Sequence, residues 1–222
     1  MVNKQDARAA IPDASLQALL GFGAATVFEA QGRRGAVSPA IKPVDPSMRL
    51  VGRALTVRAR PGDNLMLHVA IERAQRGDVI VVDASGYTEA GVWGDVMTLC
   101  AQQRGIAGLV VDGAVRDSAQ MTEMGFAVFS RGICIKDTTK SQRGEIDVEL
   151  DFCGVRIRPG DVLVGDRDGL VVVEQGDVER AIRVSREREE KEAGLRAQIR
   201  SGKSTLEVLG LEEIARTLGL KT

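Results

Sequence analysis

The ten residues Gly108–Asp117, with the sequence GLVVDGAVRD, place an apolar run directly before a guanidinium and a carboxylate. A Val-rich run predicts a buried strand, and α/β proteins usually carry their chemistry in the residues just past the end of such a strand. Arg116 offers permanent positive charge to a carboxylate or an enolate, and Asp117 offers oxygen ligands to a hard divalent cation. The stretch therefore predicts a functional site, although an Arg–Asp pair that only caps a surface turn would have the same sequence.

The residues before this stretch have the pattern of a strand–helix–strand unit. We expect a buried strand over 77–83, a loop at 84–86, a helix over about 92–104 and a second buried strand over 105–112. Such a unit favours two parallel strands, whose corresponding ends lie at one edge of the sheet. The loops that follow the two strands are therefore expected to be neighbours.

The other segments alternate between helical and strand-like patterns. The repeated Gly-Asp-Val at 77–79 and 160–162 indicates turn chemistry before buried strands and not a duplicated site. The expected elements are short helices from Pro12 and over 25–30, a half-exposed strand over 52–60, a helix over about 65–75, and strands over 161–166 and 169–173.

Composition limits the classes of partner. The 222 residues have a formal net charge of −1 and are 44% hydrophobic, so no strong field draws the chain to nucleic acid or to a membrane surface. No apolar run approaches the roughly twenty residues of a membrane span. Three cysteines without a CxxC spacing favour reduced thiols in a cytoplasmic protein. We expect no nucleic-acid partner and no membrane partner.

The composition changes after Gly176. Residues 177–200 are helix-forming and densely charged, with only a thin apolar stripe. Such a helix buries little against its own domain and is expected to be an arm on a neighbouring subunit, although a solvated helix held by ion pairs such as Glu187–Lys191 has the same pattern. The expected organisation is a core domain at 1–176 and a C-terminal helical arm at 177–222, in which a break at 201–204 precedes one last helix over 206–218.

Several weaker motifs carry no site. A phosphate loop ending in Gly202-Lys203-Ser204 would need a glycine at position 197, which is alanine. His68, the only histidine, lies in an apolar helical stretch and is expected to be a packed core residue. Ser85-Gly86 lacks the flanking glycine of a nucleophile elbow.

Three motifs in order carry a family resemblance: Trp93-Gly94-Asp95, Gly108–Asp117 and Val162–Gly169. The chain resembles the class II pyruvate aldolases that act on 4-hydroxy-4-methyl-2-oxoglutarate and 4-carboxy-4-hydroxy-2-oxoadipate, which share a fold with the regulators of ribonuclease E. The likeness covers roughly residues 15 to 175. It implies a β/β/α swivelling-type sandwich, a divalent metal (Mg²⁺ or Mn²⁺), a homotrimer or homohexamer with sites between subunits, and a role in the catabolism of aromatic compounds.

The resemblance also assigns residues. Asp117 matches the family's metal-binding aspartate, and Arg116 its catalytic and substrate-binding arginine. Asp95 matches the acid that holds the catalytic water. The backbone amides of Val96 and Met97 would bind the pyruvyl carboxylate at a helix start.

Further residues match less specific positions of the family. Asn64 and Lys140 resemble substrate-contacting residues. Glu192 matches a glutamate that reaches the metal from the next subunit, although Glu189 or Glu190 could fill that role.

The residue types agree with this chemistry. A retro-aldol cleavage removes the proton of the 4-hydroxyl group and stabilises a pyruvate enolate. A metal chelated by the α-keto acid, together with Arg116, would hold the developing negative charge, and Asp95 could act as the base through a water molecule.

Three alternatives belong to other classes. A regulator of RNA processing has the same core, but such proteins generally lack the intact Arg–Asp pair and the charged arm. A methyltransferase finds no support, because no GxGxxG loop follows an early strand. A Schiff-base aldolase would use Lys136 or Lys140, and neither has a local cationic neighbour that would activate it.

Overall fold

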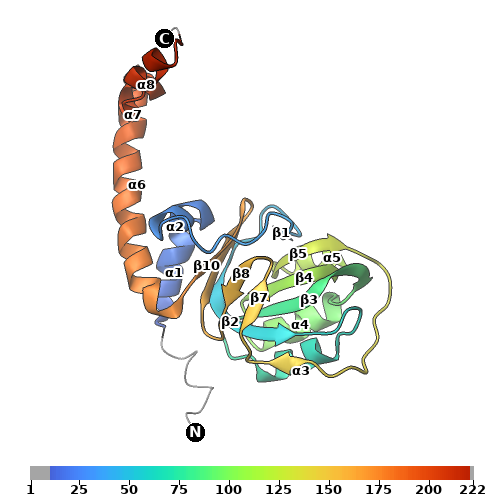
Figure 1. The fold of residues 1–222 in the computed structure, drawn as a ribbon. Helices are drawn as coiled ribbons and strands as arrows, with labels where there is room; N and C mark the ends of the chain where they lie inside the picture. The colour runs from blue at the N-terminus through green and yellow to red at the C-terminus, as the bar shows by residue number, and fades with distance from the viewer. Residues whose placement is uncertain (1–10, 221–222) are drawn as a thin grey trace.

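Four parallel strands form the centre of the sheet in the computed structural model, which describes residues 11–220. Each strand is joined to the next through a helix, and the three helices cover one face of the sheet (Figure 1). The strand–helix–strand prediction is therefore confirmed, and β3 and β4 are parallel neighbours. The elements in chain order are β2 (Leu50–Arg58), α3 (Leu65–Arg73), β3 (Asp78–Gly91), α4 (Asp95–Gln103), β4 (Gly108–Val115), α5 (Ser118–Glu123) and β5 (Ala127–Ile133).

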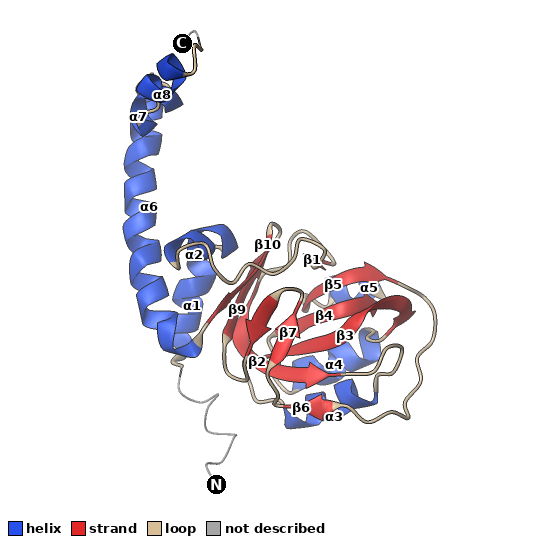
Figure 2. Ribbon diagram, viewed as in Figure 1, coloured by secondary structure: helices blue, strands red, loops and turns tan. Residues whose placement is uncertain are grey.

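Antiparallel strands complete the sheet at both edges. Its order is β1-β5-β4-β3-β2-β9-β10, and the two edge strands come into contact, so the sheet is nearly closed. A separate hairpin packs on the face opposite the helices, which gives three layers (Figure 2). These elements are β1 (Lys42–Pro43), β6 (Glu145–Ile146), β9 (Val162–Asp166), β10 (Gly169–Val173), and the hairpin strands β7 (Leu150–Phe152) and β8 (Val155–Ile157).

The main hydrophobic core lies on both faces of the parallel strands. Aliphatic side chains fill most of it, and Trp93 stacks on Phe126 with ring centroids 6.3 Å apart. The prediction of a half-exposed strand over 52–60 is wrong, because helices cover one face of β2 and the β7–β8 hairpin closes over the other. Thr56 is completely buried there and donates a hydrogen bond to the carbonyl of Val148.

A second, smaller core joins the N-terminal helices to the start of the arm. Helices α1 (Asp13–Phe22) and α2 (Ala24–Ala30) pack on β9, β10 and the first two turns of α6 (Val178–Arg200). Val178, Ala181 and Ile182 are buried in this core. The expectation that the charged helix buries little against its own domain is therefore wrong for its first three turns, since Arg188 also forms an ion pair with Glu29 of α2, and it holds only beyond them.

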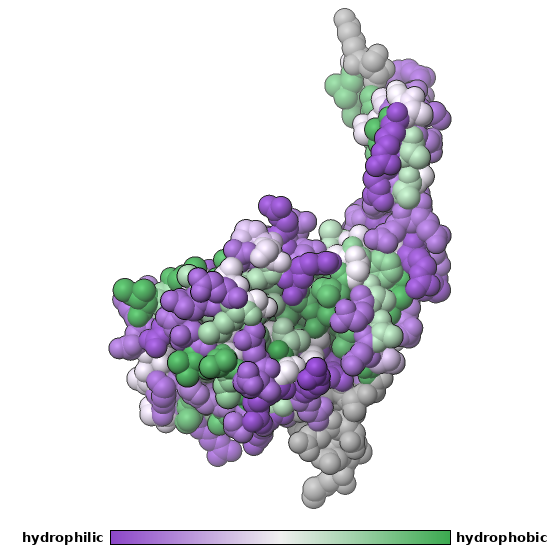
Figure 3. Space-filling model, turned by 180° about the vertical axis from the view of Figure 1, so that it is seen from behind, coloured by the Kyte–Doolittle hydropathy of each residue, from purple (hydrophilic) through white to green (hydrophobic). Residues whose placement is uncertain are grey.

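Beyond Arg188 the arm extends away from the body (Figure 1). Its surface is held by ion pairs, and Glu187 pairs with Arg183 and not with Lys191 as expected. The last segment is two short helices, α7 (Thr205–Leu209) and α8 (Glu212–Thr217), instead of the one helix predicted, because Gly210 adopts a left-handed conformation at φ 65° and ends α7. Figure 3 shows hydrophobic surface at this end of the arm, where Leu209, Ile214 and Leu218 are exposed.

Two strand boundaries differ from the prediction. The loop expected at 84–86 lies inside β3, because Ser85 (φ 58°) and Gly86 (φ 69°) form an irregularity after which the strand continues to Gly91. The strand β4 begins at Gly108 and continues to Val115, so Asp112 lies inside it and pairs with Arg131 at 2.5 Å.

No helix within residues 11–220 is long and apolar enough to span a membrane. Cys100, Cys134 and Cys153 are free thiols. The division into a core at 1–176 and an arm at 177–222 stays a prediction.

Candidate functional site

The fold joins two of the quoted motifs that lie far apart in the sequence. The helix predicted over 92–104 begins only at Asp95, because residues 92–94 run in extended conformation beside the end of β4. The amide of Val92 donates to the carbonyl of Ala114 at 2.9 Å, and the amide of Arg116 donates to the carbonyl of Trp93 at 2.9 Å. This pairing brings Asp95 next to Arg116 and Asp117.

Two glycines permit this close approach. A Cβ atom on Gly94 would lie 2.3 Å from Oδ2 of Asp117, and a Cβ atom on Gly91 would lie 2.9 Å from Cβ of Arg116. Real Cβ contacts are not this short, so a side chain at Gly94 would displace the Asp117 carboxylate. A side chain at Gly91 would displace Arg116 and the carbonyl of Cys134, which would lie 2.4 Å from the added Cβ atom. The structure thus explains the glycine of the Trp-Gly-Asp motif.

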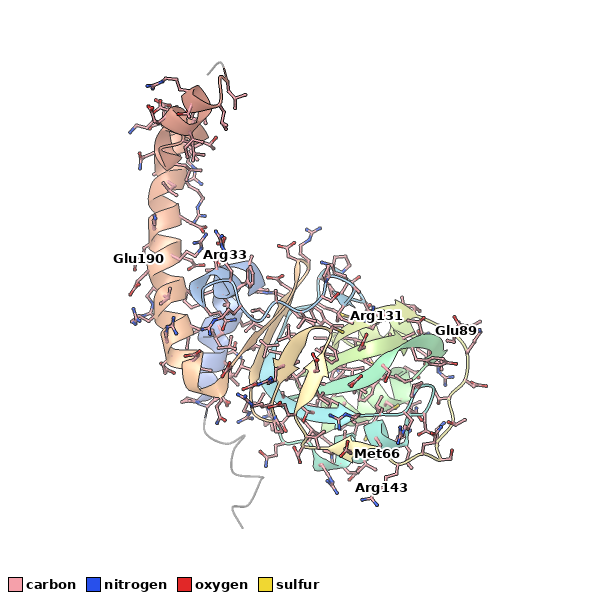
Figure 4. The ribbon with its side chains drawn as sticks, viewed as in Figure 1. Arg33, Met66, Glu89, Arg131, Arg143 and Glu190 are labelled. Carbon is pink, nitrogen blue, oxygen red and sulfur yellow. The ribbon has the colours of Figure 1, made fainter. Side chains whose placement is uncertain are left out.

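A cavity of about 460 Å³ opens at this place. It contains every residue predicted for the site except Glu192. Its lining is Asn64, His68, Gly91, Trp93, Gly94, Asp95, Val96, Met97, Arg116, Asp117, Asp137, Thr138 and Lys140. A larger cavity of about 820 Å³ lies between α3 and β6, where Figure 4 shows Met66 and Arg143, but it contains none of the predicted site residues.

Asp117 and Arg116 form the centre of the cavity. Asp117 is a left-handed residue at φ 56°, an unfavourable conformation for a side chain that is often found at functional sites. Its Oδ2 atom lies 3.5 Å from Nε of Arg116 and accepts a hydrogen bond from the amide of Asp95 at 3.3 Å. Its Oδ1 atom has no hydrogen-bond partner within residues 11–220 and is free for a ligand.

Arg116 also contacts a carboxylate that the sequence did not suggest. Its Nη1 atom lies 3.1 Å from Oδ1 of Asp137, whose side chain is 96% exposed. No sequence signal singles out Asp137, because it lies in an irregular segment far from Arg116 in the chain. A substrate carboxylate could replace this exposed acid on the guanidinium.

The start of α4 presents backbone donors to the cavity. The Val96 amide donates to Oδ1 of its neighbour Asp95 at 2.7 Å, whereas no acceptor for the Met97 amide lies within the described part of the chain. A bound carboxylate could therefore use the Met97 amide directly, and would use the Val96 amide only after the Asp95 side chain turns away. Binding of the pyruvyl carboxylate by these two amides stays a prediction.

Asn64 has an unsatisfied oxygen. The residue is 5% exposed, and its Nδ2 atom donates to the carbonyl of Val92 at 3.1 Å. Its Oδ1 atom is buried without any partner within residues 11–220. An unsatisfied buried polar atom costs about 1–3 kcal/mol, so a ligand that donates a hydrogen bond here would gain from it.

His68 is not the packed core residue that the sequence predicted. It is exposed on α3 and lines the cavity together with Lys140. Partial burial, followed by the positive charge of Lys140, lowers the pKa of His68. The four-residue spacing from Asn64 places both residues on one face of the helix, and this signal could have identified His68.

Glu192 lies on the arm and away from the cavity of its own chain. It accepts from Arg188 at 3.0 Å and from Arg196 at 3.1 Å. Glu189 and Glu190 are exposed on the same helix, and Figure 4 shows Glu190 on the arm, away from the body. Within residues 11–220, no three acidic, histidine or cysteine side chains lie close enough to hold a metal ion. Contact between Glu192 and the Asp117 of a neighbouring subunit stays a prediction.

One of the two lysines considered for a Schiff-base alternative, Lys136, has the wrong surroundings. Lys136 forms an ion pair with Glu89, and this contact raises the pKa of Lys136. A Schiff-base lysine needs a lowered pKa, so the structure disfavours Lys136 as a nucleophile.

The close approach at Gly94 leads to a testable expectation. Gly94 has φ −148°, which alanine adopts easily, so Gly94→Ala should fold normally and displace only the Asp117 carboxylate. A shift of about 1 Å in a reacting group can cost roughly 10²-fold in rate, so we expect turnover to fall by about 10- to 100-fold. Steady-state rates and thermal unfolding measure the two effects. Wild-type turnover in a folded Gly94→Ala protein would show that the position of Asp117 does not matter.

Residues 9–172 match the family model described as RraA-like, Aldolase/RraA. A protein of Halalkalibacterium halodurans that carries the provisional name 4-hydroxy-4-methyl-2-oxoglutarate aldolase is 40% identical over 149 residues, which are 67% of this chain and 71% of that protein.

Two solved structures are similar to this chain. An uncharacterised protein from Pseudomonas syringae pv. tomato has a TM-score of 0.80 and 30% identity, and the match covers 90% of this chain and 95% of that chain. The RNA-processing inhibitor RraA from Thermus thermophilus has a TM-score of 0.59 and 32% identity, and the match covers 63% of this chain and 85% of that chain.

Proposed function

Because the chain belongs to the RraA-like Aldolase/RraA family, we propose that its cavity cleaves 4-hydroxy-2-oxo diacids in a metal-dependent retro-aldol reaction. The substrates would be 4-hydroxy-4-methyl-2-oxoglutarate or 4-carboxy-4-hydroxy-2-oxoadipate. The observation that carries this proposal is the convergence of Arg116, Asp117 and Asp95 in one cavity, from two segments that pack through Gly94. A relative with an aldolase name at 40% identity supports it.

The reaction breaks the bond between C3 and C4 of the substrate. Asp95, through a water molecule, takes the proton of the 4-hydroxyl group, and C4 becomes the carbonyl carbon of the departing product. The electron pair of the broken bond forms the enolate of pyruvate, whose charge Arg116 stabilises. Protonation at C3 then releases pyruvate together with a second pyruvate or oxaloacetate.

The residues present fit a hard divalent cation. Asp117 has one carboxylate oxygen without a partner in the described chain, and it lies at the edge of an open cavity. Mg²⁺ commonly binds through one or two carboxylates and keeps several waters. When bound, such a cation supplies Lewis-acid stabilisation of the enolate oxygen. The residues that would hold it are Asp117 and Glu192 of a second copy of the chain.

The arm supports a site that two subunits share. The part of α6 beyond Arg188 extends away from the body of its own chain and forms no ion pair with it within residues 11–220, and Glu192 is oriented there by Arg188 and Arg196. A closed trimer or hexamer would place each arm on a neighbour in the same way.

The proposal is tested by pyruvate release from the two diacids. We expect activity with Mg²⁺ or Mn²⁺ and a loss of about tenfold or more with excess chelator, since removing a preorganised charge costs on that scale or above. Activity should return when the cation is restored. Full activity in chelator, or a borohydride-trapped pyruvate adduct on Lys136 or Lys140, would rule out this mechanism.

A regulator of RNA processing is the second candidate, and the similarity to the Thermus thermophilus inhibitor RraA favours it. In this case the surface of the body would bind a ribonuclease of the E type, and the cavity would have no catalytic role. Inhibition of RNA cleavage by the purified protein, unchanged by Asp95→Asn and without pyruvate release from either diacid, would support the regulator over the aldolase.

A further inference from the structure

The turn at 60–65 contains a buried carboxylate that none of the proposed steps uses. Asp63 is 2% exposed, and it lies beside Asn64 at the edge of the cavity. Burying a carboxylate is costly unless it accepts several hydrogen bonds. The hydrogen-bond donors of the Asp63 carboxylate therefore indicate its structural role.

Its partners come almost entirely from one loop. The segment 134–144 connects β5 to β6 and has mostly exposed side chains. Oδ2 of Asp63 accepts from the hydroxyl of Thr139 at 2.7 Å and from the amides of Ser141 at 2.7 Å and Gln142 at 3.1 Å. Oδ1 accepts from the amide of Leu65 at 3.0 Å, at the start of α3.

Backbone hydrogen bonds strengthen the same contact. The amide of Asn64 donates to the carbonyl of Thr139 at 3.0 Å, and the amide of Thr139 donates to the carbonyl of Gly62 at 2.9 Å. Lys140 is thus held on both sides by residues bonded to Asp63 or its turn, and its side chain lines the same cavity as Asn64.

We infer that Asp63 is a positioning residue of the cavity, which holds the 134–144 loop so that Lys140 and Asn64 face one ligand. The inference rests on the proposed function for its kinetic consequence, but the anchoring of the loop is independent of it. Burial alone would raise the pKa of Asp63, but hydrogen bonds from Ser141, Leu65, Thr139 and Gln142 outweigh burial and lower it to about 2. The anchor is therefore charged at neutral pH.

The chain contains a matched control. Residues 158–163, RPGDVL, repeat the turn at 60–65, RPGDNL. Asp161 in this second turn is 4% exposed and accepts from the amides of Arg158 at 2.8 Å and Gln175 at 3.1 Å. Neither partner belongs to the cavity or to the 134–144 loop, and burial raises the pKa of Asp161, so Asp161→Asn changes a buried carboxyl group in a turn of similar sequence.

The first measurement is hydrogen exchange of the 134–144 segment. Asp63→Asn should speed its exchange by about tenfold or more, because amides that donated to a carboxylate lose a charged acceptor. Asp161→Asn should leave this segment unchanged. Equal exchange in wild type and Asp63→Asn would overturn the inference, whether or not the protein is an aldolase.

The second measurement is kinetic. Asp63→Asn should raise KM by about tenfold or more with kcat within about threefold, since Asn64 and Lys140 would bind the ground state and the transition state alike. In a Lys140→Ala background the same substitution should raise KM far less, because the two changes act on one contact. Unchanged KM, or an equal rise in both backgrounds, contradicts a positioning role.

If Asp63→Asn does not fold, Thr139→Val serves as the second variant for both measurements. It removes one donor to Asp63 and keeps the shape of the side chain, so KM should rise in the same direction and by less. No change in KM or in exchange with this variant would also count against the inference. If the wild-type protein released no pyruvate, the proposed function would be wrong, and the exchange measurement alone would decide whether Asp63 anchors the loop.

Discussion

Asp95→Asn is expected to lower kcat by roughly 10² to 10⁴, the usual range for the loss of a general base. The amide has the shape of the carboxylate and can still accept from the Val96 amide, so α4 should begin at the same residue. What is lost is the ability to take the proton of the 4-hydroxyl group through water. Steady-state pyruvate release in saturating Mg²⁺ measures the effect.

Asp13→Asn is the matched control for this experiment. Asp13 is also the acidic first residue of a helix, and it is exposed on α1, away from the cavity. Its substitution should leave kcat unchanged. If Asp95→Asn lost its activity only at low metal concentration and regained it in excess metal, Asp95 would be a direct ligand of the cation and not the base.

The second large effect is the recovery of activity when two inactive variants form mixed oligomers. Asp117→Asn and Glu192→Gln proteins should each be nearly inactive, because each lacks one of the two carboxylates proposed to hold the cation. Dissociated and reassembled together, they should regain about a quarter of the wild-type activity, since half of the chains keep Asp117 and half of their neighbours keep Glu192 in a closed ring of equivalent interfaces.

The control mixes the wild-type protein with a double variant that carries Asp117→Asn and Glu192→Gln on the same chain. About a quarter of its sites should also be intact, so it calibrates the efficiency of reassembly. Parallel mixtures with Glu189→Gln or Glu190→Gln identify which acid reaches the neighbour. Mixtures of the two inactive proteins that stay as inactive as their parents would falsify the shared site.

Local signals predicted most of the body correctly. Val-rich runs identified the buried strands β3 and β4, and the helix between them identified their parallel pairing. The α/β fold with a helical arm and the family resemblance are confirmed by the structure and by the match over residues 9–172. These features depend on hydrophobic periodicity and on turn residues, and both are local properties of the sequence.

Exposure was predicted less well, because it depends on what packs over an element. The strand β2 alternates polar and apolar residues and is nevertheless buried on both faces, since a hairpin far along the chain covers it. His68 lies in an apolar stretch and is nevertheless exposed, because its side of α3 faces the cavity. Whether another element packs over a strand, or whether a helix faces a cavity, cannot be predicted from the polar and apolar pattern of that element alone.

The sequence by itself predicted which residues would carry the chemistry: an arginine and an aspartate after a buried strand, an acid after a glycine, and a charged arm. Only the tertiary structure decided that Gly94 lets Asp95 approach Asp117, that Asp63 holds the loop of Lys140, and that Glu192 is remote from the cavity of its own chain. The reason is physical. Side-chain chemistry belongs to single residues, whereas these distances arise from packing between segments that are far apart in the chain, and packing is settled by the whole core at once.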